Sequence, residues 1–151
     1  MKIPLILGLA CLLCSGVMAD ENLKITGTRM NGRTSADISY KFFYTLARNN
    51  NQSVKIEFTA GLGHVWWDGD ERDEGRLHAD VSLGINSFYW SIGPILTSGT
   101  KGGVAAGLRT MIGYQFRSRV FAGAYWEFVA GLPFSDRGSR SGIGIQAGFS
   151  F

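Results

Sequence analysis

The sequence has little cysteine: its two cysteines, Cys11 and Cys14, both lie within residues 1–19. These residues have the features of a secretory signal, with a positive start, an apolar run and small residues before a cleavage site after Ala19. The alternative is a membrane anchor, but the apolar run is shorter than the roughly 20 residues of a spanning helix. We therefore expect a signal peptide at 1–19 and one mature domain at 20–151. Such a domain has no thiol, which excludes disulfides, thiolate metal sites and cysteine nucleophiles.

Helical periodicity and long apolar runs are missing from the mature domain as well. No stretch repeats its apolar residues at the helical period, and none is long enough to span a membrane as a helix. The formal charge of +3 is too small to indicate a nucleic-acid partner. Aromatic residues make up 13% of the chain, which excludes a disordered protein.

Alternation of apolar residues with polar or small residues is the dominant pattern instead. For example, one face of the strand expected at residues 36–47 carries Ile38, Tyr40, Phe42, Tyr44 and Leu46. Alternation at every second residue predicts β-strands. The alternating stretches are residues 22–29, 36–47, 53–66, 76–86, 87–98, 103–116, 119–130 and 142–151. They predict about eight strands of roughly ten residues, the length that a tilted strand needs to cross a bilayer.

Two architectures fit these strands: a soluble sandwich or barrel with an apolar interior, or a membrane barrel with an apolar exterior. Composition favours the second, because the less apolar face is rich in serine and in glycine, of which the chain has 21, and small residues suit a narrow lumen. We therefore predict an all-β fold, a closed antiparallel transmembrane β-barrel of about eight strands. It is expected to be a monomer in the outer membrane of a Gram-negative bacterium.

The expected links between strands alternate in length, as they do in outer-membrane barrels. The long links are expected at 29–35, 67–76, 97–103 and 131–139, and the short links at 47–52, 86–87 and 116–119. Aromatic residues near the strand ends are expected at the two membrane interfaces. They are Trp66, Trp67, Trp90, Tyr114, Phe116 and Phe134.

The final stretch, residues 142–151, ends in Phe151. It resembles the terminal strand that bacterial outer-membrane barrels present to their assembly machinery. The resemblance to small eight-stranded outer-membrane barrels covers the whole mature chain. It implies outer-membrane lipid, lipopolysaccharide and the barrel assembly machinery as partners.

A second, partial likeness concerns residues 61–75. They are similar to the strand and acidic glycine-rich loop of lipid A deacylases, small barrels whose active site faces the membrane. The likeness implies a lipid-facing catalytic role for His64. Those enzymes carry a His-x-Ser pair on a late strand, but the comparable residues here, 124–128, include neither histidine nor serine. We therefore do not expect a deacylase.

Alternation predicts charged side chains of both signs inside the barrel. They are Lys24, Lys41, Lys55, Arg109, Asp37, Glu57, Asp80 and Glu127. Buried charges must be paired, so we expect an ion-paired interior that blocks water. Eight strands enclose only enough space for side chains, which disfavours a pore. A narrow conduit and a catalytic site stay open as alternatives.

Four residues are candidates for catalysis. His78, Asp80 and Ser82 share a strand face and are the residue types of a base, an orienting carboxylate and a nucleophile. Neighbours on one face of a strand are about 6.5 Å apart, so direct contact needs help from other strands. His64 has the opposite phase, toward lipid, and is either an interfacial residue or a group acting on lipopolysaccharide. For His78 we expect a hydrogen-bonding role.

The charged links suggest two further sites. The acidic loop from Asp68 to Glu74 has carboxylates that suit Ca²⁺ or Mg²⁺, but Arg72 interrupts it and an EF-hand spacing is missing. A solvated loop is expected, with no metal and no cofactor. Basic residues in or beside the outer links are expected to pair with lipopolysaccharide phosphates or to be ordinary rim charges. They are Arg29, Arg33, Arg76, Lys101, Arg137 and Arg140.

These observations favour a structural or surface-interaction protein with a plugged polar interior, at the face of the membrane that carries lipopolysaccharide. One alternative is a lipid A-modifying hydrolase. The other is a narrow, porin-like conduit for small solutes.

Overall fold

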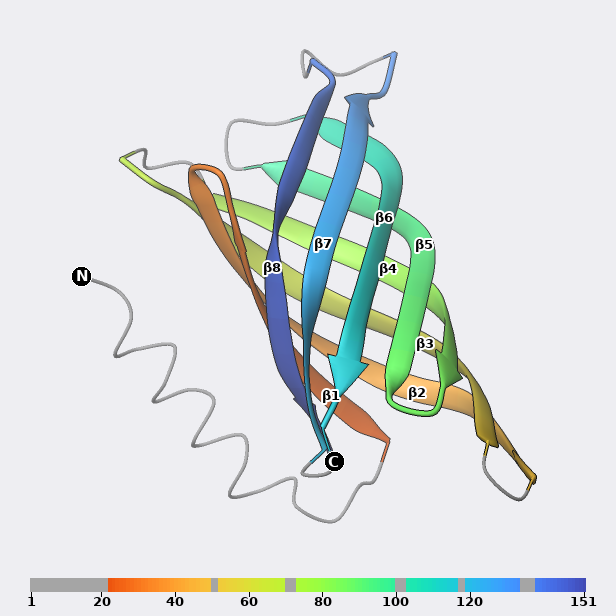
Figure 1. The fold of residues 1–151 in the computed structure, drawn as a ribbon. Coiled ribbons are helices and arrows are strands. Elements are labelled where there is room, and N and C mark those ends of the chain that lie inside the picture. Colours follow the sequence, from red (N-terminus) through yellow and green to blue (C-terminus); the bar gives the residue numbers. More distant parts are fainter. Residues whose placement is uncertain (1–21, 50–51, 70–72, 100–102, 117–118, 134–137) are drawn as a thin grey trace.

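The computed structural model describes residues 22–49, 52–69, 73–99, 103–116, 119–133 and 138–151, and these form an all-β fold. Eight antiparallel strands make a closed barrel in which sequence neighbours pair (Figure 1). The strands are β1 (Leu23–Met30), β2 (Arg33–Asn49), β3 (Gln52–Trp67), β4 (Asp73–Ile85), β5 (Phe88–Gly99), β6 (Val104–Gln115), β7 (Val120–Gly131) and β8 (Arg140–Ser150). The predicted closed barrel of about eight strands is confirmed. The expected signal peptide lies outside the described residues.

The barrel closes where β1 meets β8. In this ladder Lys24 lies opposite Ser150, and just beyond it the Phe151 amide donates to the Leu23 carbonyl at 2.9 Å. The alternating C-terminal strand therefore completes the cylinder and covers the edge that β1 would otherwise expose.

The two ends of the barrel are distinguished by their connections. The terminal end is where β1 begins and β8 finishes, and the β2–β3, β4–β5 and β6–β7 connections lie there (Figure 1). The loop end carries the connections β1–β2, β3–β4, β5–β6 and β7–β8. Among the residues described, no helix is long and apolar enough to cross a membrane.

The β1–β2 connection is shorter than expected. Instead of a long link at 29–35, β1 continues to Met30 and β2 begins at Arg33. The turn between them is Asn31-Gly32, with Gly32 at a φ of 72°. Gly32 occupies the position of the turn that needs a positive φ, which glycine adopts at little steric cost.

Side chains alternate between the outside and the inside of the barrel. In β4 buried and exposed residues alternate without a break from Glu74 to Ile85. The outside is apolar: Ile143 and Ile145 are 67% and 70% exposed. The inside is mostly polar, and Thr28 and Asp37 are each 1% exposed. This distribution is the reverse of a protein that folds around an apolar core in water.

A β-bulge interrupts the alternation of β2 between Lys41 and Phe43. A bulge adds one residue to one strand, so the residues beyond it lie on the opposite face from the one that the alternation before the bulge predicts. Past the bulge, Leu46 lies opposite Lys55, whose phase is inward. The prediction that Leu46 continues the outer face of Ile38 is therefore wrong.

Candidate functional site

Strand β4 provides the backbone of a polar interior. Its inward, buried residues, in order from the loop end to the terminal end, are Glu74, Arg76, His78, Asp80 and Ser82. Glycines on β3 make room for this row and its partners. A Cβ added to Gly61 would come within 2.7 Å of the His78 ring, and one added to Gly63 would collide with the Asp37 carboxylate. Small residues in β3 therefore determine how deeply the polar side chains can pack.

The interior at the loop end is closed by one tryptophan between two guanidinium groups. The Trp67 ring lies 5.2 Å from the Arg33 guanidinium and 5.4 Å from that of Arg140. The Trp67 indole N–H donates to Glu74 Oε1 at 3.2 Å, and Arg140 pairs with the same carboxylate. The prediction that Trp67 belongs to an exterior girdle is wrong, since adjacent residues on a strand point to opposite faces and Trp66 takes the outer one.

Below this closure lies a buried ion-pair cluster around Glu127. Arg33 Nη2 is 2.8 Å from Glu127 Oε1, and Arg76 Nη1 is 3.4 Å from Oε2. Arg76 also binds both carboxylate oxygens of Asp37, and the Tyr125 hydroxyl donates to Glu127 at 2.7 Å. The cluster therefore holds two guanidinium groups and two carboxylates in one hydrogen-bonded unit.

His78 lies at the centre of the barrel, between a serine and an aspartate. Its Nε2 is 3.4 Å from Ser39 Oγ, and its Nδ1 is 3.1 Å from Asp80 Oδ2. This order resembles that of a hydrolytic triad, but Arg109 Nη2 lies 2.8 Å from the same Nδ1. The two neighbours of Nδ1 therefore oppose each other, because a guanidinium can only donate and a carboxylate can only accept.

That arrangement differs from a hydrolytic triad, in which the carboxylate serves the imidazole alone. Arg109 neutralises Asp80 through two hydrogen bonds, one of them 2.8 Å long. The predicted row of His78, Asp80 and Ser82 is only partly brought together, since Ser82 lies among the residues that line the terminal end. Ser39, the serine that contacts His78, is not among the residues that the sequence predicts for this site.

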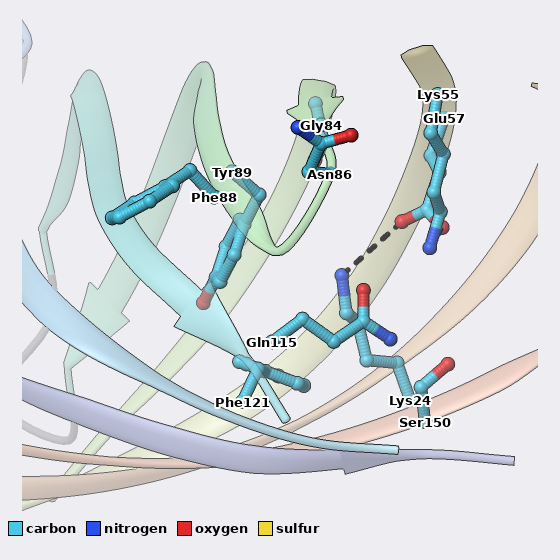
Figure 2. A pocket seen from close by; sticks show the side chains of 11 residues that line it. Lys24, Lys55, Glu57, Gly84, Asn86, Phe88, Tyr89, Gln115, Phe121 and Ser150 are labelled. Carbon is cyan, nitrogen blue, oxygen red and sulfur yellow. Dashed lines mark hydrogen bonds and ion pairs between the residues drawn. The ribbon is translucent and has the colours of Figure 1, made fainter. Parts of the chain in front are cut away.

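The terminal end holds a pocket built around Glu57. Its carboxylate contacts Lys55 Nζ and, at 3.4 Å, Lys24 Nζ. Figure 2 shows Tyr89 on one side of the pocket and Lys55 with Glu57 on the other, with Phe121 near Lys24. The pocket volume is about 20 Å³, which is room for roughly one water molecule. Of the predicted interior charges, Lys41 also acts electrostatically on Glu57.

Four of the six basic residues expected at the lipopolysaccharide face lie in the described part of the chain, and they differ in where their side chains lie. Arg29 lies on the outside and pairs with Asp68 at 2.5 Å. Arg33 and Arg76 are 2% and 3% exposed and point into the barrel, so the predicted surface role is wrong for them. Arg140 is mostly covered by its pair with Glu74. Lys101 and Arg137 lie outside the described residues.

His64 lies on the exterior near the loop end, as its phase predicts. Its Nε2 is 3.6 Å from Asp73 Oδ2, and its ring centroid is 4.7 Å from that of Trp66. In the sheet register Gly75 separates His64 from Ser98. Two strand spacings amount to about 9.6 Å between those backbones. His64 therefore has the Asp73 carboxylate beside its imidazole, but it makes no direct contact with Ser98.

The acidic loop is only partly described. Asp68 pairs with Arg29, Asp73 lies beside His64, and Glu74 pairs with Arg140. Asp70 and Glu71 lie outside the described residues, as does Phe134. Within the described part of the chain, no group of three or more histidine, cysteine or carboxylate residues could hold a metal ion.

Comparisons with known proteins add no relative: no family model, no curated protein and no solved structure matches this chain. The fold and its side-chain contacts are therefore the basis for assigning a function.

Proposed function

We propose that the chain is a small outer-membrane barrel with a plugged polar interior, and that its role is structural or concerns interactions at the lipopolysaccharide-bearing face. One observation carries the proposal: the barrel combines an apolar exterior with an interior of paired charges. A bilayer suits that inversion, because lipid solvates the apolar exterior and a closed sheet leaves no backbone edge unsatisfied.

The plugged interior argues against transport. Between the loop end and the terminal end, the lumen is crossed by the Trp67 closure, by the Glu127 cluster and by the pair between Asp80 and Arg109. Each blocks the path with side chains that would have to give up charge-assisted hydrogen bonds before a solute could pass. A conduit would need at least one of these groups to swing aside.

Localisation is the first test. The full-length chain is expressed in a Gram-negative host, and its membranes are separated by density. We expect the protein in the outer-membrane fraction, in a form whose gel mobility changes when it is heated. Recovery from the soluble fraction would overturn the proposal.

The exterior arginine supplies a test of the surface role. With the barrel in the proposed orientation, Arg29 lies at the outer rim, with its side chain 60% exposed. Arg29→Gln is expected to weaken binding of purified lipopolysaccharide to the detergent-solubilised protein, because a guanidinium can contact a phosphate through two hydrogen bonds. Arg48→Gln is the matched control, because Arg48 is exposed in β2 near the terminal end. Equal loss in both variants would indicate non-specific charge attraction.

A second candidate, a lipid A-modifying hydrolase, is favoured by one observation, the exterior pair of His64 and Asp73. Mass spectrometry of lipid A from cells with and without the protein tests it directly. An acyl chain lost with the native chain but retained with His64→Ala would replace the structural proposal by the enzymatic one.

A further inference from the structure

The terminal-end pocket differs from the rest of the interior in its charge. Lys24 and Lys55 both contact Glu57, so these three groups together carry one net positive charge. Lys41 lies close enough to act on the same carboxylate. A positive pocket with solvent access at a barrel end is a site where an anion would be stabilised.

Neutral hydrogen-bonding groups surround these lysines. Ser82, Asn86, Gln115 and Ser150 line the same pocket, and each can donate a hydrogen bond. Tyr89 also lines it, and the Tyr89 hydroxyl donates to the sulfur of Met111 at 2.9 Å. A thioether is a weak acceptor, so an entering oxyanion would offer this hydroxyl a stronger one.

Aromatic rings fix the position of one cation. Lys24 Nζ lies 4.9 Å from the centroid of Phe121 and 5.9 Å from that of Tyr89. These cation–π contacts hold the Lys24 ammonium beside the two rings, while it also reaches the Glu57 carboxylate next to Lys55 (Figure 2). The two ammonium groups lie on either side of the Glu57 carboxylate, which both of them contact.

We infer that this pocket binds a single oxyanion group, a carboxylate or a phosphate, presented from the terminal end. The volume admits one oxygen atom of such a group, with the remainder of its molecule outside the pocket. Lys24 and Lys55 bind the charge, and the Tyr89 hydroxyl and the Ser150 and Gln115 side chains donate to the oxygens. The site lies at the opposite end of the barrel from Arg29, and its test does not depend on where the protein is localised.

The test uses the full chain folded in a sugar-based detergent that carries no phosphate. Sodium phosphate and sodium acetate are titrated separately at constant ionic strength, balanced with chloride, and backbone amide shifts are followed by NMR. We expect saturable shifts at Lys24, Gly84 and Ser150 for at least one of the two anions. Phosphate alone, or acetate alone, would identify which chemistry the site takes.

Two kinds of variant separate charge from space. Lys24→Gln and Lys55→Gln are each expected to weaken binding about tenfold, since one charge-assisted hydrogen bond accounts for that factor. Gly84→Val keeps both lysines but fills the pocket. A Cβ at Gly84 makes only ordinary contacts, 3.4 Å from Lys55 and 3.7 Å from the Phe88 carbonyl, so the barrel should still close.

The matched control is Gly75→Val, on the outside of the same strand, where a Cβ has only the Ser98 carbonyl within 4.0 Å. Binding abolished by Gly84→Val and unchanged by Gly75→Val supports the site. Three results would overturn it: no saturable shift with either anion, equal shifts when chloride alone is varied, or binding that persists in Gly84→Val. Heat-modifiable gel mobility checks that every variant is folded.

Discussion

The two halves of the barrel interior stabilise buried charge in different ways. Toward the loop end, four guanidinium groups meet four carboxylates; these residues are Arg33, Arg76, Arg109, Arg140, Asp37, Glu74, Asp80 and Glu127. Toward the terminal end, two ammonium groups share the single carboxylate of Glu57. Among the residues that the structure describes, one half is balanced and the other carries excess positive charge.

The choice between arginine and lysine explains much of this contrast. Arg76 binds both oxygens of Asp37, and Arg109 binds both oxygens of Asp80. A planar guanidinium matches a carboxylate edge to edge, so such pairs pack densely and fix one geometry. An ammonium is a point charge on a flexible stem and imposes less order on its surroundings. The arginine half therefore forms the plug, whereas the lysine half keeps a pocket.

The largest effect is expected in the arginine half. Glu127→Ala removes a carboxylate that pairs with both Arg33 and Arg76, so that two buried guanidinium groups each lose an ion-pair partner. The free energy of unfolding should fall by about 3–5 kcal/mol, the usual cost of breaking a buried pair from one side. Urea unfolding in lipid vesicles, followed by tryptophan fluorescence, measures it. A loss below about 1 kcal/mol would show that water enters this half and solvates the arginines.

A somewhat smaller effect is expected on the exterior. Ile145→Arg places a charge on the outer face and should cost about 2–4 kcal/mol if that position lies at the middle of a bilayer. Ser141→Arg, on the same face of β8 nearer the loop end, is the control and should cost about 0–1 kcal/mol. The same unfolding measurement compares them. A neutral Ile145→Arg would contradict the proposed membrane exterior.

The smallest effect is expected in the lysine half. Lys55→Gln removes one of the two cations that contact Glu57, so that Lys24 and Glu57 balance each other in charge. The Lys55 side chain is already 24% exposed. The free energy of unfolding should change by at most about 1 kcal/mol, as for other solvent-accessible pairs. A loss as large as that of Glu127→Ala would mean that the two halves do not differ in how they stabilise charge.

Period-two alternation was enough to predict the barrel, but it was less informative about the ends of strands. Arg76 has the same phase as His78, and Arg33 has the same phase as Asp37, so both could have been assigned to the interior. Both also lie within the expected links at 29–35 and 67–76, so their position in the sequence fits a loop as well as a strand end. In a barrel with a polar interior, an inward arginine and a loop arginine look alike in sequence.

Contacts between strands were the other part that the sequence did not reveal. Ser39 reaches His78 because β2 and β4 lie on either side of β3, where Ser39 and His78 are both opposite Gly61. That register belongs to the β2–β3 and β3–β4 pairings, and a shift of one residue in either pairing would move every side chain of a strand to the other face. Alternation identifies which residues are inside, but not which of them meet.

The seam between β1 and β8 also has a consequence for the timing of synthesis. Gln146 donates to Thr28 across it at 2.9 Å, and 118 positions of sequence separate the two residues. A ribosome has therefore made nearly the whole chain before the first residues of the barrel can meet their final partners. Until then β1 keeps an open edge and every strand shows an apolar face, a state that aggregates readily in water.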